Sequence, residues 1–314
     1  GHDMRRNTRA PRAGLILLAA LGAVLAAPAG AGAAVREYWI AAVPVPWNIA
    51  PNGRNAIEGE QLDPERTHIT TVVFRSYTRN FGRRLDRRGQ DQQRGLIGPL
   101  IRGEVGDRFI VHFANRDHVF NRPHSMHFRG VRYRFGSDGS FIPGFSGDGA
   151  RVMPGRTYTY RFTAGADSRG VWPYHDHSPS MEPSIAGGLY GALSIRGAGQ
   201  RRPDREFVVF FGNVGGFSTI NGRAFVGNTP VFRARVGDVV QWDVLGLGDD
   251  FHTFHVHGHR WRRPEGTPED TRVVGPAESF AVRWREDVPG TWLYHCHVES
   301  HMMHGMIGIY RVRR

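Results

Sequence analysis

Short apolar runs alternate with turn residues along most of the chain after residue 35. Val, Ile, Phe, Tyr and Thr gather in these runs, and Gly, Pro and Asp separate them. This pattern is typical of β-strands, and no long segment has the 3.6-residue period of an amphipathic helix. The spacing of the runs predicts an all-β fold of antiparallel sandwiches. The runs that predict strands are 70–76, 108–115, 157–163, 191–196, 206–211, 239–244, 279–284 and 307–312.

An internal repeat divides the chain into two similar halves. The segment RGEVGD recurs as RARVGD, HSMHFRG recurs as HTFHVHG, and WPYHDH recurs as WLYHCH, in the same order. Segments repeated in order indicate homologous structural units. The sequence therefore predicts domain 1 at residues 35–198, a linker at 199–204 and domain 2 at 205–314.

Residues 1–34 have the pattern of a secretory signal that follows a tag remnant, Gly1–Asp3. Basic residues come first, an apolar run covers Gly14–Ala27, and Ala31–Ala33 offers small residues for cleavage. The apolar run is too short and too rich in Ala and Gly to span a bilayer. We expect a secreted protein with no membrane span in its mature form. The Arg5-Arg6 pair leaves general and twin-arginine export both open.

Composition limits the remaining possibilities. The 314 residues include 41 basic residues, all Arg, and 29 acidic ones, which gives a net charge of +12. Removing residues 1–33 takes away four Arg and one Asp, and leaves +9. The Arg residues are scattered rather than interleaved with aromatic residues, which argues against nucleic-acid binding. The single cysteine, Cys296, excludes an intrachain disulfide and a Cys-rich zinc site.

The histidine spacing predicts two groups of side chains on opposite strand faces. Residues two apart share a face of a strand, so Cys296 points away from its neighbours His295 and His297. His252 lies three residues before His255 and can share the face of Cys296. The pairs that share a face are His175/His177, His255/His257 and His295/His297, and His127 is the remaining half of a fourth pair.

One face carries the ligand set of a type 1 copper site. Such a site takes one thiolate, two imidazoles and a weak axial thioether, here Cys296, His252, His301 and Met306. The other face offers imidazoles only, which suit copper among other metals. A His-Cys-His tripeptide would join the two sites covalently. His259 and His304 lie near the site but are less well spaced to act as ligands, and Met302 and Met303 follow His301 too closely to supply the axial thioether. The histidines that match no site are His2, His68, His112 and His118.

Together with VREYWIA at residues 35–41 and GPLIRGEVGD at 98–107, these motifs resemble the multicopper oxidases. The sequence is similar to two-domain small laccases and to the cupredoxin domains of ceruloplasmin over essentially the whole mature chain. The resemblance implies two cupredoxin-like Greek-key β-sandwich domains. It also implies a homotrimer, in which domain 1 of one chain meets domain 2 of the next around a copper cluster.

The same resemblance implies a role for each ligand. Type 2 copper takes His127 and His255, one type 3 copper takes His175 and His297, and the other takes His177, His257 and His295. Type 1 copper takes His252, Cys296, His301 and Met306. Three neighbouring residues carry over as well: Asp138 as a proton relay, Tyr133 as a source of a redox equivalent, and Asp270 as a further acidic residue.

Two departures from the family pattern matter. Domain 1 has Asp176 in the place of Cys296 and Leu189 in the place of Met306, so His124 is the remnant of a lost type 1 site. This argues against two-domain nitrite reductases, which carry their blue copper in domain 1. The second departure is Arg129, which stands where a type 3 histidine belongs, and a guanidinium has no lone pair to offer a metal.

These features predict a secreted, laccase-like oxidase. It would remove single electrons from phenols, aromatic amines or low-valent metal ions and reduce O₂ to water. An axial Met favours a lower type 1 potential than an apolar residue, and hence easily oxidised donors. The alternative is a copper-binding electron-transfer protein whose cluster is impaired by Arg129. A ferroxidase or cuprous oxidase would need an acidic patch near His301, for which Glu299 alone is thin support.

Overall fold

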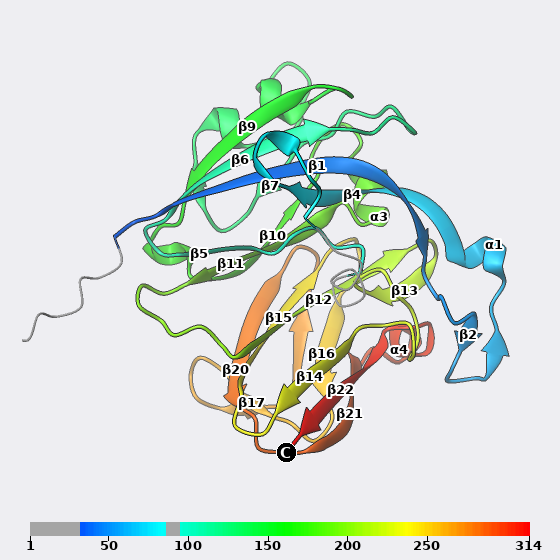
Figure 1. The fold of residues 1–314 in the computed structure, drawn as a ribbon. Helices are drawn as coiled ribbons and strands as arrows, with labels where there is room; N and C mark the ends of the chain where they lie inside the picture. Colours follow the sequence, from blue (N-terminus) through cyan, green and yellow to red (C-terminus); the bar gives the residue numbers. More distant parts are fainter. Residues whose placement is uncertain (1–31, 86–94) are drawn as a thin grey trace, which may run out of the picture. The chain divides into compact units, whose positions relative to one another are not determined.

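The computed structural model describes residues 32–85 and 95–314, and this part of the chain consists mainly of β-strands. Figure 1 shows that strands from residues 35–196 and strands from residues 205–313 gather in two separate groups. Each group contains two sheets. The predicted all-β fold of two cupredoxin-like Greek-key β-sandwich domains is confirmed. The signal segment predicted at residues 1–34 lies almost entirely outside the described residues.

The first group has a five-stranded and a four-stranded sheet. The order in the five-stranded sheet is β4 (His68–Tyr77), β1 (Val35–Asn48), β6 (Arg108–Asn115), β9 (Thr157–Thr163) and β8 (Arg132–Tyr133). The order in the four-stranded sheet is β5 (Ile101–Glu104), β11 (Tyr190–Arg196), β10 (Gly170–His175) and β7 (His127–Phe128).

The second group repeats this strand order, except that the fifth strand belongs to the sheet whose counterpart in the first group has four strands. One sheet has the order β13 (Phe217–Ile220), β12 (Arg205–Val214), β15 (Val239–Gly246) and β20 (Ser279–Arg285). The other has the order β14 (Val231–Arg235), β22 (Ile307–Arg313), β21 (Gly290–Cys296), β16 (His252–Val256) and β19 (Thr271–Val274). Two small hairpins pair β2 (Arg54–Asn55) with β3 (Glu60–Gln61), and β17 (Trp261–Arg262) with β18 (Pro268–Glu269).

Most strand pairs are antiparallel, as the sequence predicts, but the prediction missed the parallel pairs. Each large sheet contains one parallel pair: β1 with β6, β5 with β11, β12 with β15, and β14 with β22. A parallel pair needs a connection that leaves the sheet, and here the chain crosses to the opposite sheet before it returns. Short apolar runs mark strands but not their partners, so the sequence did not reveal this pairing.

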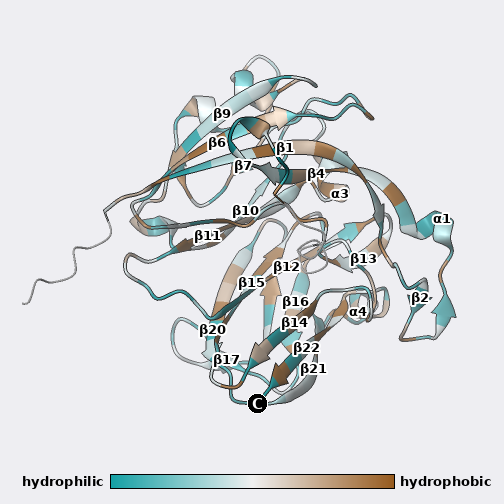
Figure 2. Ribbon diagram, in the orientation of Figure 1, coloured by the Kyte–Doolittle hydropathy of each residue, from teal (hydrophilic) through white to brown (hydrophobic). Residues whose placement is uncertain are grey.

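Alternating side chains build a separate core in each sandwich. In the second, Trp242 is fully buried, stacks with Trp284 and meets Tyr310 edge-on, and Cys296 and Met306 belong to the same apolar cluster. In the first, Phe109, Phe128 and other aromatic residues play the same part. Figure 2 shows hydrophobic segments along the strands and hydrophilic ones along many of the connecting loops. The strands that carry the candidate ligands in each sandwich therefore pack against an aromatic core.

The two sandwiches also share apolar contacts. Trp47 and Ile49 of the first sandwich pack in one cluster with Phe217 and Phe225 of the second sandwich. The Trp47 indole N–H also donates to the Gly222 carbonyl at 2.7 Å. A further cluster joins residues of β10 and β11 to residues of β12 and β15.

The described part of the chain holds no helix long and apolar enough to cross a bilayer. Its α-helices are α1 (Pro64–Thr67), α3 (Met181–Ala186) and α4 (Glu299–Met303).

Candidate metal centre

Cys296 lies between two imidazoles that reach it from separate elements. His252 begins β16, Cys296 ends β21, and His301 lies on α4. The Cys296 sulfur is 3.9 Å from His252 Nδ1 and 3.8 Å from His301 Nδ1. All three donor atoms lie within 4.8 Å of one another. One soft thiolate and two imidazoles at this spacing fit a copper ion.

Met306 lies beside this group. Its main-chain carbonyl accepts a hydrogen bond from the Cys296 N–H at 3.1 Å, and its own N–H donates to the His301 carbonyl at 3.0 Å. The bend before it requires Gly305, whose φ is +125° and where a Cβ would lie 2.7 Å from the Ser218 carbonyl oxygen. Met306 is fully buried in the core cluster that contains Cys296. These contacts hold the thioether-bearing residue next to the thiol.

Burial favours the neutral forms of His252 and Cys296 before a metal binds. Burial lowers the pKa of His252 to about 4, so its imidazole retains a lone pair at neutral pH. Burial also raises the pKa of the Cys296 thiol, although the Thr253 N–H donates to the sulfur at 3.4 Å. A metal would therefore have to displace the thiol proton as it binds.

In domain 1, three imidazoles converge where β7 begins and β10 ends. The strand register pairs His127 with His175, and the His177 ring lies 5.3 Å from that of His127 and 5.6 Å from that of His175. His127 Nδ1 donates to the Asp138 carbonyl at 2.7 Å, and His175 Nδ1 donates to the Asp176 carbonyl at 2.9 Å. Because Nδ1 carries the proton in both rings, Nε2 is free to act as a metal ligand.

In domain 2, four imidazoles converge in the same way. His255 pairs with His295 across β16 and β21, and their Nδ1 atoms donate to the carbonyls of Asp270 at 2.7 Å and Cys296 at 2.9 Å. His257 Nε2 lies 3.1 Å from His295 Nε2, and the His297 ring lies 5.3 Å from that of His295. Burial, followed by the neighbouring imidazoles, lowers the pKa of His295 to about 4.

The geometry follows the face alternation expected from the sequence. The Cys296 sulfur faces His252 and His301, whereas the rings of His295 and His297 face His255. β10 ends at His175 and β21 ends at Cys296, so His177 and His297 lie just beyond the strands. Among the described residues, no ring contact joins an imidazole of domain 1 to one of domain 2's four cluster imidazoles. The two imidazole groups are thus separate half-sites.

Comparison with known proteins gives this arrangement a context. Residues 83–200 and residues 200–314 each match a family model described as multicopper oxidase. The chain belongs to the multicopper oxidase family. Members of this family are copper-containing oxidoreductases that use O₂ and reducing substrates.

Individual relatives agree with this assignment. The chain is 33% identical to a probable nitrite reductase-hydroxylamine oxidoreductase fusion protein of Kuenenia stuttgartiensis, over 68% of this chain and 27% of the relative. It is 28% identical to hephaestin of Homo sapiens, over 89% of this chain and 29% of the relative. It spans less than a third of the length of either. A crystal structure of a multicopper oxidase matches its fold with a TM-score of 0.67, at 24% identity, over 88% of this chain and 89% of the other.

Three residues predicted to support a multicopper oxidase cluster lie beside the half-sites. The Tyr133 ring meets the His127 ring edge-on at 6.1 Å, and burial, together with the Asp138 carboxylate, raises the pKa of Tyr133 to about 12. The Asp138 carboxylate is 3.8 Å from His127 Nδ1, but the main-chain carbonyl of Asp138 takes the hydrogen bond. Asp270 likewise contacts His255 through its carbonyl, while its carboxylate accepts from the Thr271 hydroxyl at 3.1 Å.

Arg129 follows β7 and lines a cavity of about 640 Å³ together with His127, His175 and His177. Burial is the largest cause of the lowered pKa values of His127 and His175, and the positive charge of Arg129 is a smaller cause that acts in the same direction. The domain 2 counterpart of Arg129 is His257, whose imidazole contacts His295. A cationic side chain therefore occupies the position in domain 1 that an imidazole occupies in domain 2.

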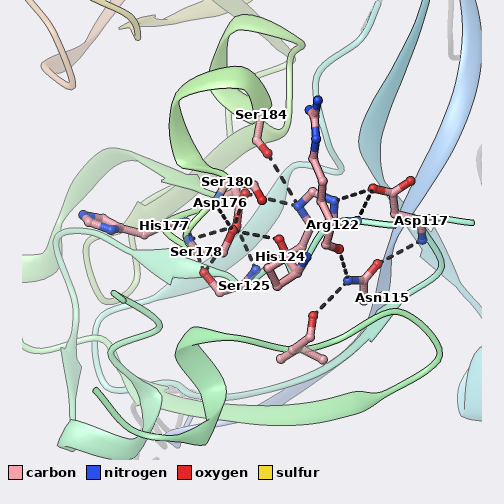
Figure 3. Close-up of polar contacts among 12 residues, drawn as sticks. Asn115, Asp117, Arg122, His124, Ser125, Asp176, His177, Ser178, Ser180 and Ser184 are labelled. Atoms are coloured by element: carbon pink, nitrogen blue, oxygen red, sulfur yellow. Dashed lines mark hydrogen bonds and ion pairs between the residues drawn. The ribbon is translucent and has the colours of Figure 1, made fainter. Parts of the chain in front are cut away.

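The position in domain 1 that corresponds to Cys296 and His252 in the repeat holds a buried hydrogen-bonded triad. Figure 3 shows His124 between Asp117 and Asp176. Leu189 corresponds to Met306 in position. Its carbonyl accepts from the Asp176 N–H at 3.2 Å, just as the Met306 carbonyl accepts from the Cys296 N–H. The sequence did not reveal the partners Asp117 and Ser184. Ser184 could not be matched to His301 by counting residues, because the segment from Asp176 to Leu189 is three residues longer than the segment from Cys296 to Met306.

Other histidines outside the half-sites have partners of their own. His259 Nε2 contacts Glu286 at 3.0 Å and its Nδ1 contacts the His257 carbonyl at 2.7 Å, so both ring nitrogens are engaged. His112 contacts Glu37 and Thr159, and His68 contacts the Pro64 carbonyl. These contacts favour structural roles for all three.

Glu286 provides a test of this domain 2 network. Its carboxylate also accepts from the Tyr310 hydroxyl at 2.6 Å, and against the effect of burial these bonds lower its pKa from 4.5 to about 2. A lowered pKa adds stability above pH 4.5 that is lost as the pH falls toward 2. We expect Glu286→Gln to lower the free energy of unfolding by about 3 kcal/mol at pH 6 and by about 1 kcal/mol at pH 3.

Chemical denaturation at the two pH values measures this difference. Glu65→Gln, at an exposed position on α1, is the control and should change stability little at either pH. An equal loss for Glu286→Gln at pH 3 and pH 6 would contradict the lowered pKa.

Proposed function

We propose that this multicopper oxidase is laccase-like, and that it couples one-electron oxidation of phenolic, aromatic or low-valent metal substrates to the four-electron reduction of O₂ to water. The observation that carries the proposal is the position of Cys296. Its sulfur faces His252 and His301, and the residues on either side of it belong to the imidazole group of domain 2. One tripeptide therefore connects an electron-accepting site to a half-cluster.

The proposed copper ligands are those implied by the sequence. Bound copper would supply the one-electron and O₂ chemistry, as a type 1 ion and a cluster of one type 2 and two type 3 ions, up to four ions per chain. The proposed type 1 ligands are His252, Cys296, His301 and Met306. Those of the cluster are His127 and His255 for type 2, His175 and His297 for one type 3 ion, and His177, His257 and His295 for the other.

The chain's own residues orient and protonate this site. Main-chain carbonyls fix the Nδ1–H tautomer of His127, His175, His255 and His295, which aims each Nε2 at the cluster. The Asp138 carboxylate lies close enough to His127 to pass protons toward the cluster, where O₂ reduction consumes four of them. We assign Tyr133 as a reserve electron donor and Asp270 as a second acidic residue beside the cluster.

The proposed assembly is a homotrimer of chains with domain 1 at 35–198 and domain 2 at 205–314. Each domain carries one imidazole group, so a complete cluster needs a junction between domain 1 and domain 2, and the resemblance to two-domain small laccases places that junction between chains. An apolar patch on the loop around Asp138 supports such a junction. Its members are Phe135, Ile142 and Phe145, with exposed fractions of 57%, 56% and 68%.

The patch gives a prediction for assembly. We expect Phe145→Asp to convert most of the trimer to monomer, because a charge would then be desolvated in the proposed junction. Cluster copper should be lost with the trimer, while the type 1 copper within domain 2 stays bound. Light scattering and copper analysis measure both effects. Ile57→Asp, a similar exposed change on the β2–β3 hairpin, is the control. A stable, fully copper-loaded monomer of the unaltered protein would reject the intersubunit cluster.

We also propose that residues 1–34 are a secretion signal, so that the mature enzyme acts outside the cytoplasm. Mass spectrometry of the protein recovered from the medium or periplasm of an expressing cell tests this. The expected N-terminus lies just after Ala33.

Oxygen uptake by copper-loaded protein tests the oxidase function. With a phenol such as 2,6-dimethoxyphenol as donor, we expect O₂ consumption at one O₂ per four donor electrons, with no accumulation of H₂O₂. The second candidate is an electron-transfer protein with an impaired cluster, which Arg129 favours. That protein would show blue colour, one copper per chain and no O₂ uptake.

A further inference from the structure

A buried network occupies the place of the lost type 1 site in domain 1, and the role assigned to it here rests on the oxidase function proposed above. Two main-chain hydrogen bonds at this place correspond between the two domains. In domain 1 the Ser125 N–H donates to the Asp176 carboxylate at 2.8 Å, and in domain 2 the Thr253 N–H donates to the Cys296 sulfur at 3.4 Å. The His177 N–H donates to the Ser125 hydroxyl at 3.1 Å where the His297 N–H donates to that of Thr253 at 3.0 Å.

The four positions of the type 1 ligand set correspond one by one. Asp176 takes the place of Cys296, and its carboxylate lies 3.2 Å from His124 Nδ1. Ser184 takes the place of His301, because its carbonyl accepts from the Leu189 N–H at 2.9 Å as the His301 carbonyl accepts from Met306 at 3.0 Å. His124 itself corresponds to His252. Hydrogen bonds thus join the same three segments in domain 1 that a metal ion would join in domain 2.

The Asp176 carboxylate is fully buried and holds several donors at once. It accepts from the Ser125 N–H, from the Ser178 N–H at 3.2 Å and from the Ser178 hydroxyl at 3.0 Å, besides His124. On its far side, His124 Nε2 lies 3.0 Å from the buried Asp117 carboxylate. Charge-assisted hydrogen bonds of this kind are stronger than neutral ones, and buried networks that are fully satisfied are rigid.

The network reaches all three imidazoles of the domain 1 half-site. The Asp176 carbonyl fixes His175 Nδ1, and the Ser125 hydroxyl holds the main chain of His177. The Ser125 hydroxyl also donates to the Gly139 carbonyl at 2.7 Å, next to Asp138, whose carbonyl fixes His127. Figure 3 shows Ser125, Asp176 and His177 in this arrangement.

We propose that Asp176 is a positioning residue, which orients His127, His175 and His177 without any metal at the lost type 1 position. Domain 2 has no equivalent carboxylate, and its sulfur accepts only weakly. Domain 1 therefore presents an ordered half-cluster in the copper-free protein, whereas domain 2 gains the corresponding cross-link only when copper binds Cys296.

Crystal structures of the copper-free full chain test the proposal. Asp176→Asn preserves shape but removes the charge and an acceptor, and we expect the rings of His127, His175 and His177 to move or lose their single orientation. Asp107→Asn is the matched control, because Asp107 is also a buried carboxylate of domain 1, held by two main-chain N–H groups and Arg36. Unmoved rings in Asp176→Asn would overturn the proposal.

Chelator competition gives a second readout. We expect cluster copper to bind roughly 10- to 100-fold more weakly in Asp176→Asn, with type 1 copper unchanged and Asp107→Asn like the unaltered protein. If Asp176→Asn does not fold, Ser125→Ala tests the same link and should displace His177. An unaltered protein that takes up only type 1 copper would count against the oxidase function, and the copper-free ring positions would still decide the role of Asp176.

Discussion

Replacement of Cys296 by Ser is expected to abolish the intense blue colour of the copper-loaded protein and to reduce its oxidase rate to background. The thiolate is the only sulfur ligand that can give the charge-transfer absorption of a type 1 site, and the chain has no other cysteine. It is also the candidate type 1 ligand that is bonded directly to both His295 and His297, so it offers the shortest covalent path between the two groups. The visible spectrum and O₂ uptake of copper-loaded protein measure the two losses.

Met303→Leu is the matched control for this experiment. Met303 lies on α4 close to His301, but it is not among the proposed ligands, so its replacement should leave the colour intact. The type 1 assignment fails if the unaltered protein stays colourless after copper loading and chemical oxidation.

Replacement of Arg129 by His restores the missing cluster ligand, and we expect cluster copper and O₂ consumption to rise together, by roughly tenfold or more. The guanidinium cannot ligate, and its charge beside His127 and His175 opposes binding of a cation. The unaltered protein should therefore contain substoichiometric type 3 copper and show a weak near-ultraviolet type 3 band. The blue absorbance per chain should not change, because Cys296 lies in the other domain.

Arg161→His is the control for this gain. Arg161 is an exposed residue of β9 and does not line the cavity of His127, His175 and His177, so an extra histidine there adds an imidazole to domain 1 outside that cavity. If the unaltered protein already holds four copper ions per chain and Arg129→His does not speed it up, the account of Arg129 is wrong.

The sequence predicted most of the candidate site because β-structure has a simple periodicity. Alternation of side chains along a strand separated Cys296 from His295 and His297, and the repeat identified the second half-site. The same arithmetic failed where the chain leaves a strand. The domain 1 segment that contains α3 is longer than its counterpart with α4, so Ser184 could not be aligned with His301 by counting residues.

By itself, the sequence determined the fold class, the repeat and the family. It also determined the identity of the candidate ligands, since these follow from local spacing and from residue chemistry. The tertiary structure decided which strands pair in parallel, that carbonyls fix the histidine tautomers, and that Asp117, His124 and Asp176 form one buried network. These features join residues far apart in the chain, through packing and hydrogen bonds that no local pattern encodes.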